Sequence, residues 1–382
     1  MKKHVFLLAA LAMAAMLVFV ACGNNEDEIR IGLIAPLSGG TAVFGISSTN
    51  GSRLAIEELN EAGGLLGLPV RYMMLDDDNN VPTAVNNFQR LVHNDGVVAI
   101  VGPVTSGPTT AVTNAAVETR TPIITPTATA EAVTTPGDFI FRACFLDAQQ
   151  AVTLANFAHD YLNAQTAAVL FNNSMDYATG LANNFETHFQ ALGGTMVAME
   201  AYSAGAQDFR TQLINIRNAN PDVLFIPEYF TTVALIAHQV RDLGIDAILL
   251  GPDGWDGVLN HITDPSLLEG SFFSSHYAGD DPDPIRREAI QNFNDRYYAR
   301  FGSIPNSFAA LGYDAARIML AAIEAAGSTD NEAIIAALKD TNHNGVTGNI
   351  TFDENGNPIK NVLVLRIGNG EARYHQTFEP FQ

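Results

Sequence analysis

The chain has 382 residues, 47% of them hydrophobic and 16% charged, which is long enough for two packed cores and too apolar for a disordered chain. Its 41 Asp and Glu against 20 Lys and Arg give a formal net charge of −21. This acidic excess opposes binding to phosphate backbones and anionic membrane surfaces, so we exclude nucleic acid as the expected partner.

The first 22 residues have the pattern of an export signal. Lys2 and Lys3 precede an uninterrupted apolar run, 5–21, that ends in small residues. A permanent transmembrane anchor is the alternative, but 17 apolar residues are at the lower limit for a membrane span. We therefore predict a signal peptide over 1–22.

The signal ends in the sequence FVAC at 19–22, which resembles a bacterial lipoprotein cleavage box, with Phe19 in place of the usual leucine. In such boxes the cysteine is lipidated, so we expect a lipid on Cys22. The polar residues 23–28 then form a flexible tether. These features predict an exported lipoprotein, anchored to the membrane through its lipid and facing the periplasm or the cell exterior.

The chain has two cysteines, so a lipidated Cys22 leaves Cys144 without a disulfide partner. A catalytic thiol is the alternative for Cys144. No neighbouring His or Lys would lower its pKa, and its apolar neighbours indicate a buried structural position.

Strands and helices alternate after the tether. The run 29–35 (IRIGLIA) predicts a strand ended by Pro36, and a helix follows over 49–62 with Ser47 or Ser48 as its N-cap. The alternation continues with strands at 70–75, 97–101 and 122–125 and helices at 83–94 and 109–118.

A second alternating series begins near residue 148. It predicts helices at 148–162, 180–192, 209–219 and 231–243, and strands at 167–171, 197–202, 223–226 and 247–250. The remainder predicts helices at 284–301, 308–326 and 331–339, and short strands around 350 and at 362–367. Apolar strands between amphipathic helices are typical of parallel sheets covered on both faces, so the expected fold class is α/β with two doubly wound units.

Ligands of such sheets bind beyond the carboxyl ends of the strands. In the first series the loop 102–107 (GPVTSG) and the loop 125–129 (TPTAT) bring hydroxyl groups and a helix N-terminus to this edge, where an anion such as a carboxylate is favoured. An ordinary capped turn is the alternative for either loop alone.

The corresponding loops of the second series are acidic and aromatic. They contain Asp176 and Tyr177, then 227–230 (PEYF), then 251–255 (GPDGW). Such a set suits an ammonium group, so the two series together complement a zwitterion. Taken singly, each aromatic residue could instead cover a core.

Enzyme and metal signatures are missing. The sequence has no G-x-S-x-G, no phosphate-binding G-x-x-x-x-G-K, no G-x-G-x-x-G and no H-E-x-x-H, and its nine histidines lack ligand spacing. The acidic run 76–78 and the segment 353–358 are better explained as a solvated strand end and a turn than as cation sites. We expect neither enzyme activity, nor a cofactor, nor a metal site.

Four motifs occur in the order typical of one family. They are 31–39 (IGLIAPLSG), 50–64, the pair Asp76 and Asp77, and 101–106 (VGPVTS). In this combination, which spans nearly everything after the tether, the chain resembles the leucine/isoleucine/valine-binding proteins, type I periplasmic binding proteins of ABC transporters. The resemblance implies two lobes joined by a three-strand hinge: lobe 1 with 29–145 and 276–352, and lobe 2 with 146–275 and 353–382.

The resemblance also implies ligand-binding residues in lobe 1. The positions that hold the ligand carboxylate in the family fall on Ser106 and Thr129, with backbone groups offered by Ala128. An aromatic position of the family, tryptophan in some members, falls on Phe44.

In lobe 2 the two tyrosines of the family site fall on Tyr177 and Tyr229. The acidic partner of the ligand ammonium falls on Asp253, where many members have the longer glutamate. Glu228 stands where relatives often have small residues, so it could favour a ligand with an additional positive or donor group.

The function expected from these features is capture of a small amino acid, branched-chain or similar, by hinge closure and its delivery to the permease subunits of an ABC transporter. A binder of amides, urea or aromatic acids is the alternative within the fold, although Asp253 would then be an unpaired charge. A ligand-sensing receptor and an exported hydrolase or dehydrogenase are the alternatives outside it.

Overall fold

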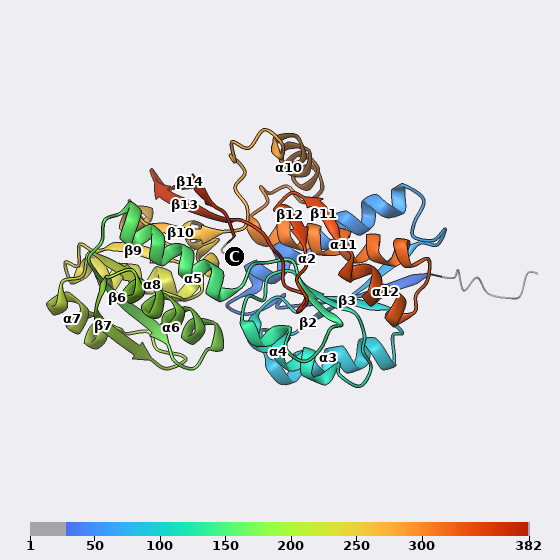
Figure 1. The fold of residues 1–382 in the computed structure, drawn as a ribbon, viewed down its shortest axis with the longest axis horizontal. Coiled ribbons are helices and arrows are strands. Elements are labelled where there is room, and N and C mark those ends of the chain that lie inside the picture. Colours follow the sequence, from blue (N-terminus) through green and yellow to red (C-terminus); the bar gives the residue numbers. More distant parts are fainter. Residues whose placement is uncertain (1–27, 381–382) are drawn as a thin grey trace, which may run out of the picture.

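Two sheets with parallel cores organise residues 28–380, the part of the chain that the computed structural model describes (Figure 1). The predicted signal peptide 1–22, with Cys22, and all but the last residue of the tether 23–28 lie outside the described residues. Among the helices of the described part, none is long and apolar enough to cross a membrane.

The first sheet has five parallel strands in the order β2-β1-β3-β4-β5. Alternate residues of β1 face opposite sides, so Ile31 and Leu33 enter one core and Ile34 the other. Burial on both faces explains the nearly continuous apolar strand sequences. The strands are β1 (Ile29–Ala35), β2 (Val70–Asp76), β3 (Ala99–Val101), β4 (Ile123–Thr125) and β5 (Ile140–Arg142).

The helices of this first lobe lie on both faces of its sheet. Helices α3 and α4 contribute to one core, whereas α2, α11 and α12 contribute to the other. The helices are α2 (Ala42–Glu61), α3 (Val81–His93), α4 (Ser106–Ala115), α10 (Arg287–Phe301), α11 (Ser307–Ala326) and α12 (Asn331–Lys339), with a hairpin of β11 (Asn342–Gly345) and β12 (Gly348–Thr351).

The second sheet has seven strands in the order β14-β13-β10-β9-β8-β6-β7. Five strands are parallel, and the antiparallel hairpin β13–β14 is added beside β10. The strands are β6 (Thr166–Asn172), β7 (Thr195–Tyr202), β8 (Val223–Phe225), β9 (Ile248–Gly251), β10 (Phe272–Ser275), β13 (Val362–Gly368) and β14 (Glu371–Phe378).

Helices cover both faces of the second sheet as well, because alternate residues of β6 enter two different cores. The α-helices of this second lobe are α5 (Asp147–Asn156), α6 (Asp176–Ala191), α7 (Arg210–Ala219), α8 (Phe230–Asp242) and the short α9 (Val258–His261). A π-helical turn, η2 (Phe157–Tyr161), continues α5, and the 3₁₀ turns η3 (Asp253–Trp255) and η4 (Pro265–Leu268) follow β9. The turn η3 carries the predicted site residue Asp253.

The chain passes between the two sheets three times: between β5 and β6, between β10 and α11, and between β12 and β13 (Figure 1). The predicted lobe limits after residues 145, 275 and 352 fall within these passages. We retain the limits themselves as a proposal. Because three segments connect the lobes, rotation of one lobe against the other would be confined to a hinge.

The prediction of the first helix was wrong at its start. Helix α2 begins at Ala42 rather than at 49, so Phe44 is a helical residue. The glycine and the serines of 45–48 are weak helix formers, which is why the sequence predicted a loop there. They are small because the backbone of Pro36 and helix α11 lie close by: a Cβ on Gly45 would lie 1.8 Å from the Pro36 oxygen.

Helices α2 and α11 contact each other through glycines. A Cβ on Gly51 would lie 1.9 Å from the Ala309 oxygen, and one on Gly312 would lie 2.0 Å from the Ser48 oxygen. The Ser52 hydroxyl donates a hydrogen bond of 2.9 Å to the Gly312 carbonyl across the same contact. The separation of the helices therefore depends on the absence of side chains at these positions.

We expect Gly312→Ala to lower the free energy of unfolding by about 1–3 kcal/mol, because the added methyl forces the helix backbones apart. Denaturant unfolding followed by circular dichroism measures this change. Gly180→Ala is the matched control, since Gly180 is inside helix α6 and its Cβ would have no neighbour closer than 4.0 Å. The control should be neutral or slightly stabilising, and an equal loss in both variants would contradict the packing argument.

Candidate ligand-binding site

One small cavity lies where segments that follow the strands of both sheets meet. Its volume is about 10 Å³, which is room for about one water molecule. Six of the eight residues predicted for the site line it. The first lobe contributes Phe44, Val104, Thr105, Ser106, Thr127, Thr129 and Phe308, and the second contributes Tyr177, Tyr229, Asp253 and Gly254.

Hydroxyl groups and a helix N-terminus form the first-lobe side. Ser106 lines the cavity and is the first residue of α4, where the first backbone N–H groups have no acceptor within the helix. The Thr127 hydroxyl donates to the Val104 carbonyl at 2.5 Å, and the Thr125 hydroxyl donates to the Pro103 carbonyl at 2.7 Å. These bonds tie the two loops together, and the helix end favours a negatively charged group.

A buried cation, Arg142, supports the second of these loops. Its guanidinium is fully buried and donates to the Ala128 carbonyl at 3.0 Å, the Ala130 carbonyl at 2.9 Å and the Thr134 hydroxyl at 3.2 Å. Among the described residues no carboxylate accepts a hydrogen bond from it, and burial lowers its pKa. The positive charge therefore lies behind the loop that carries Thr129.

Ala128 was predicted to offer backbone groups to a ligand. In the structure its N–H and its carbonyl both form hydrogen bonds within the first lobe. Its carbonyl accepts from Arg142, and its N–H donates to the Thr125 hydroxyl at 3.1 Å. The residue is fully buried and does not line the cavity. Its contribution is to the shape of the loop, because the flanking residues Thr127 and Thr129 both reach the cavity.

The second-lobe side is centred on Asp253, which is 3% exposed. One carboxylate oxygen accepts from the Tyr177 hydroxyl at 2.7 Å and from the Gln150 amide at 3.1 Å. The other accepts from His276 Nε2 at 3.1 Å. Burial lowers the pKa of His276 to about 4, although the neighbouring Asp253 opposes this shift, so the imidazole is neutral at pH 7. The donors to Asp253 among the described residues are thus uncharged.

A second carboxyl group, Asp147, lies beside this network, and no sequence motif pointed to it. It is 2% exposed, and one of its oxygens accepts from the Gln150 amide at 3.0 Å, while the other has no hydrogen-bond partner among the described residues. Burial raises the pKa of Asp147 to about 8, a shift that polar contacts with Thr129 and Gln150 partly oppose. Asp147 therefore holds its proton at neutral pH, and Asp253 is the carboxyl group that lines the cavity.

Glu228, the other acidic residue predicted for the site, does not line the cavity. Its carboxylate is turned into the second lobe, where it accepts from the Tyr202 hydroxyl at 2.5 Å and from the backbone N–H of Tyr229 at 2.8 Å. Burial raises the pKa of Glu228. The residue precedes the first turn of α8, and its side chain and that of Tyr229 point in different directions, which the sequence alone could not decide.

Aromatic rings close the apolar part of the site. The ring of Phe44 stacks on Phe308 with centroids 4.0 Å apart and meets Tyr229 edge-on at 5.4 Å. Tyr229 in turn stacks on Tyr177 at 5.1 Å. Sequence reasoning missed Phe308, because it lies more than 250 residues after Phe44 and only the fold brings the two together. Thr127 belonged to a loop that was recognised, but it was not selected.

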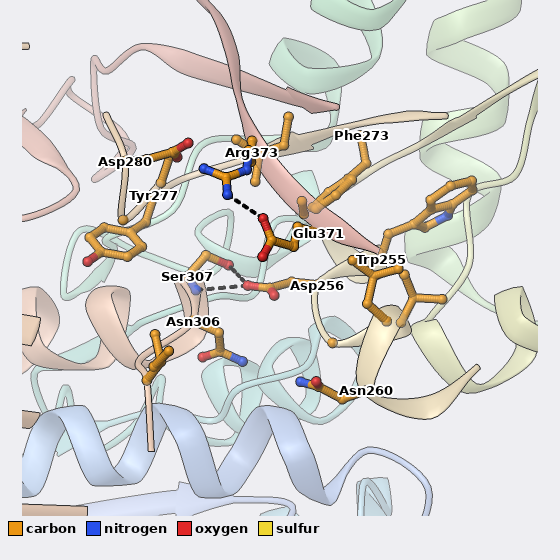
Figure 2. A pocket seen from close by; sticks show the side chains of 18 of the residues that line it. Trp255, Asp256, Asn260, Phe273, Tyr277, Asp280, Asn306, Ser307, Glu371 and Arg373 are labelled. Atoms are coloured by element: carbon orange, nitrogen blue, oxygen red, sulfur yellow. Dashed lines mark hydrogen bonds and ion pairs between the residues drawn. The ribbon is translucent and has the colours of Figure 1, made fainter. Parts of the chain in front are cut away.

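A larger cavity of about 460 Å³ lies between other segments of the two lobes, and it contains none of the predicted site residues (Figure 2). Segments 304–307, 277–280, 255–260 and 370–373 line it. Two pairs of its polar residues bond to each other: Asp256 with Ser307, and Glu371 with Arg373. The smaller cavity is therefore the better candidate for a specific ligand site.

Comparison with known proteins decides the family. Residues 28–372 match the family model described as periplasmic binding protein. The chain belongs to the periplasmic binding protein family. Its resemblance to the leucine/isoleucine/valine-binding proteins and the predicted fold of two doubly wound α/β lobes are thereby confirmed.

Three similar proteins place this periplasmic binding protein more closely. The Leu/Ile/Val-binding protein BraC3 of Rhizobium johnstonii is 31% identical, over 92% of each chain. A leucine binding protein of Thermotoga maritima is 34% identical with a TM-score of 0.86, over 92% of this chain and 99% of the other. A branched-chain amino acid transporter substrate binding protein of Streptococcus pneumoniae, in complex with isoleucine, is 30% identical with a TM-score of 0.86, over 93% of this chain and all of the other.

Proposed function

We propose that this protein captures an α-amino acid, branched-chain or similarly small, between its two lobes and delivers it to an ABC transporter. The observation that carries the proposal is the polarity of the small cavity. Hydroxyl groups and a helix N-terminus lie on its first-lobe side, and a carboxylate bonded by neutral donors lies on its second-lobe side. The names of the relatives support the same ligand class.

The two sides suit the two charged ends of an amino acid. In this proposal the ligand carboxylate binds Ser106, Thr129 and the N-terminus of α4, where the charge of Arg142 also favours an anion. The ligand ammonium pairs with Asp253, for which it is the missing cationic partner. The aromatic rings of Phe44 and Tyr229 contact the apolar side chain.

Entry of the ligand requires the lobes to separate, since a cavity of about 10 Å³ admits no amino acid. Contacts from both lobes then favour the closed state, because a ligand shifts a conformational equilibrium only through its different affinity for the two states. This is hinge closure. The ligand-free open form and the ligand-bound closed form would be distinguished by the transporter.

Titration calorimetry with a panel of ligands tests the proposal. We expect leucine, isoleucine or valine to bind with a dissociation constant near micromolar, about −8 kcal/mol. Leucinamide lacks the carboxylate and isovalerate lacks the ammonium, so both should bind far more weakly. Binding of benzoate, urea or an amide in place of every amino acid would overturn the amino-acid assignment and leave the family unchanged.

The periplasmic binding protein family consists of exported proteins, and we propose that this member is a lipoprotein anchored through Cys22. Mass spectrometry of the protein purified from membranes should find a diacylglyceryl group on Cys22 as the new N-terminal residue. Cys22→Ser should release the protein from the membrane fraction. A mature chain that starts at another residue would contradict the lipid anchor.

A further inference from the structure

A carboxylate of the second lobe bonds to a helix of the first lobe in the lining of the larger cavity (Figure 2). Asp256 follows η3 and accepts two hydrogen bonds through one oxygen, from the backbone N–H of Ser307 at 2.8 Å and from its hydroxyl at 2.6 Å. Ser307 begins α11, which packs on α2 and β3 of the first lobe. The two residues thus connect structures built on different sheets.

The contact completes the N-terminal cap of α11. The first backbone N–H groups of a helix have no intrahelical acceptor, and a carboxylate there also interacts favourably with the helix dipole. Within the first lobe, the Asn306 side chain accepts from the N–H of Ala309 at 3.0 Å. The N–H of Ser307, a residue 2% exposed, obtains its acceptor from the other lobe. Separation of the lobes would remove this acceptor.

The same turn carries the carboxylate that faces the ligand cavity. Asp253 begins η3, and the N–H of Asp256, the residue after this turn, donates to the Asp253 carbonyl at 3.0 Å. The Gly254 N–H donates to the Tyr177 hydroxyl at 3.1 Å, and the Trp255 indole donates to the Ile226 carbonyl at 2.9 Å. Because the turn is held at each of its residues, Asp253 and Asp256 move together.

The cavity beside Asp256 allows water near its carboxylate, which reduces the cost of a charge at this position. Burial raises the pKa of Asp256, and the hydrogen bonds from Ser307 oppose this shift. The residue is partly buried and lines the cavity of about 460 Å³, which has room for water. Water in this cavity lowers the cost of desolvation, which in a dry interior would exceed the gain from two hydrogen bonds.

We infer that Asp256 is a closure latch: it caps helix α11 of the first lobe only when the lobes are together, and so raises ligand affinity without touching the ligand. The effect on affinity rests on the proposed function, since it requires a ligand that binds the closed state. The hydrogen bonds themselves do not depend on which ligand that is.

Asp256→Ala tests the latch, with isoleucine as the ligand in calorimetry. The variant leaves the Ser307 N–H without its acceptor in the closed state alone, so affinity should fall roughly 5- to 100-fold. Asp256→Asn keeps an acceptor oxygen and should recover most of the loss, because asparagine and aspartate cap helices about equally well. An Asn variant as weak as the Ala variant would assign Asp256 a role in the turn alone and would overturn the latch.

The second lobe offers a matched control. Asp264 caps η4 through the same pair of bonds, from the Ser266 N–H at 3.0 Å and its hydroxyl at 2.6 Å, but both residues belong to one lobe. Asp264→Ala should therefore leave the dissociation constant unchanged, whatever it does to stability. An equal loss of affinity in Asp256→Ala and Asp264→Ala would contradict a role in closure.

Hydrogen exchange separates failure of the latch from failure of the proposed function. Exchange of the Ser307 amide, followed in a peptide covering 304–309 with isoleucine bound, should be faster in Asp256→Ala than in the wild type. If the wild type binds no amino acid, the proposed function fails, and the same comparison with whichever of benzoate, urea or an amide binds still decides the latch. Equal exchange rates in the two ligand-bound proteins would overturn the latch for any ligand.

Discussion

Asp253→Asn is expected to weaken binding of an α-amino acid by roughly thirtyfold to several thousandfold, the effect of losing one member of a desolvated charge pair, about 2–5 kcal/mol. Asp253 is 3% exposed, and its bonds come from a tyrosine, a glutamine and a neutral histidine. None of these side chains neutralises the carboxylate. In the proposed complex the ligand ammonium is its counterion, and the asparagine amide provides no charge for that ammonium.

Calorimetry with isoleucine measures the loss, and Ser106→Ala is the comparison. That variant removes one hydroxyl from the opposite side of the cavity and should cost about 1.5–3 kcal/mol, the usual value of a hydrogen bond to a charged group. The fold should persist in both variants, which circular dichroism checks. Wild-type affinity in Asp253→Asn would mean that the ligand has no ammonium group at this position, and the ligand class would have to be revised.

Much of the fold could be predicted because it depends on local patterns. The strand predicted over 29–35 has the bounds of β1, because an apolar run that ends at a proline defines both ends of a strand. Strands β5, β10, β11 and β14 were missed. The first three are short, with three or four residues, and β14 has only half-buried or exposed side chains, so none shows a long periodic pattern.

The candidate site could be predicted in part, because the topology places the ends of parallel strands at one edge. Ser106, Thr129 and Asp253 all follow strands, and they line one cavity. The topology does not, however, predict the direction in which a side chain within a loop points. Glu228 is adjacent to Tyr229 in sequence, yet its carboxylate bonds to Tyr202 inside the lobe.

Two buried residues that support the site without lining the cavity, Arg142 and Asp147, could not be predicted from the sequence either. Arg142 contacts the loop of Thr129 from a neighbouring strand, and the backbone N–H of Asp147, at the start of α5, donates to the Thr129 carbonyl at 3.0 Å. A lone arginine or aspartate in a sequence is most often on the surface. Only the packing of both lobes shows that these two are buried, and the contact of Asp256 with Ser307 likewise exists only across the lobes.

The side chain of Trp255 packs the turn that carries Asp253 and Asp256 against the second sheet. Trp255 is fully buried, and the backbone of Gly251 lies so close that a Cβ there would be 2.1 Å from the indole ring. The indole N–H donates to the Ile226 carbonyl at 2.9 Å at the end of the neighbouring strand. The ring therefore fixes the turn against two adjacent strands of the second sheet.

Trp255→Ala should lower the free energy of unfolding by about 3–5 kcal/mol, through the cavity that it leaves. Phe185→Ala in the same lobe should cost a similar amount, because Phe185 is also fully buried and stacks on Phe225 at 4.6 Å. The two variants should differ in ligand binding, measured by calorimetry at a temperature where both are folded. Trp255→Ala releases the turn and should weaken isoleucine binding by roughly tenfold or more, about the loss of one hydrogen bond. Phe185→Ala should bind as the wild type does, and equal affinities in the two variants would mean that Trp255 stabilises the lobe without positioning the turn.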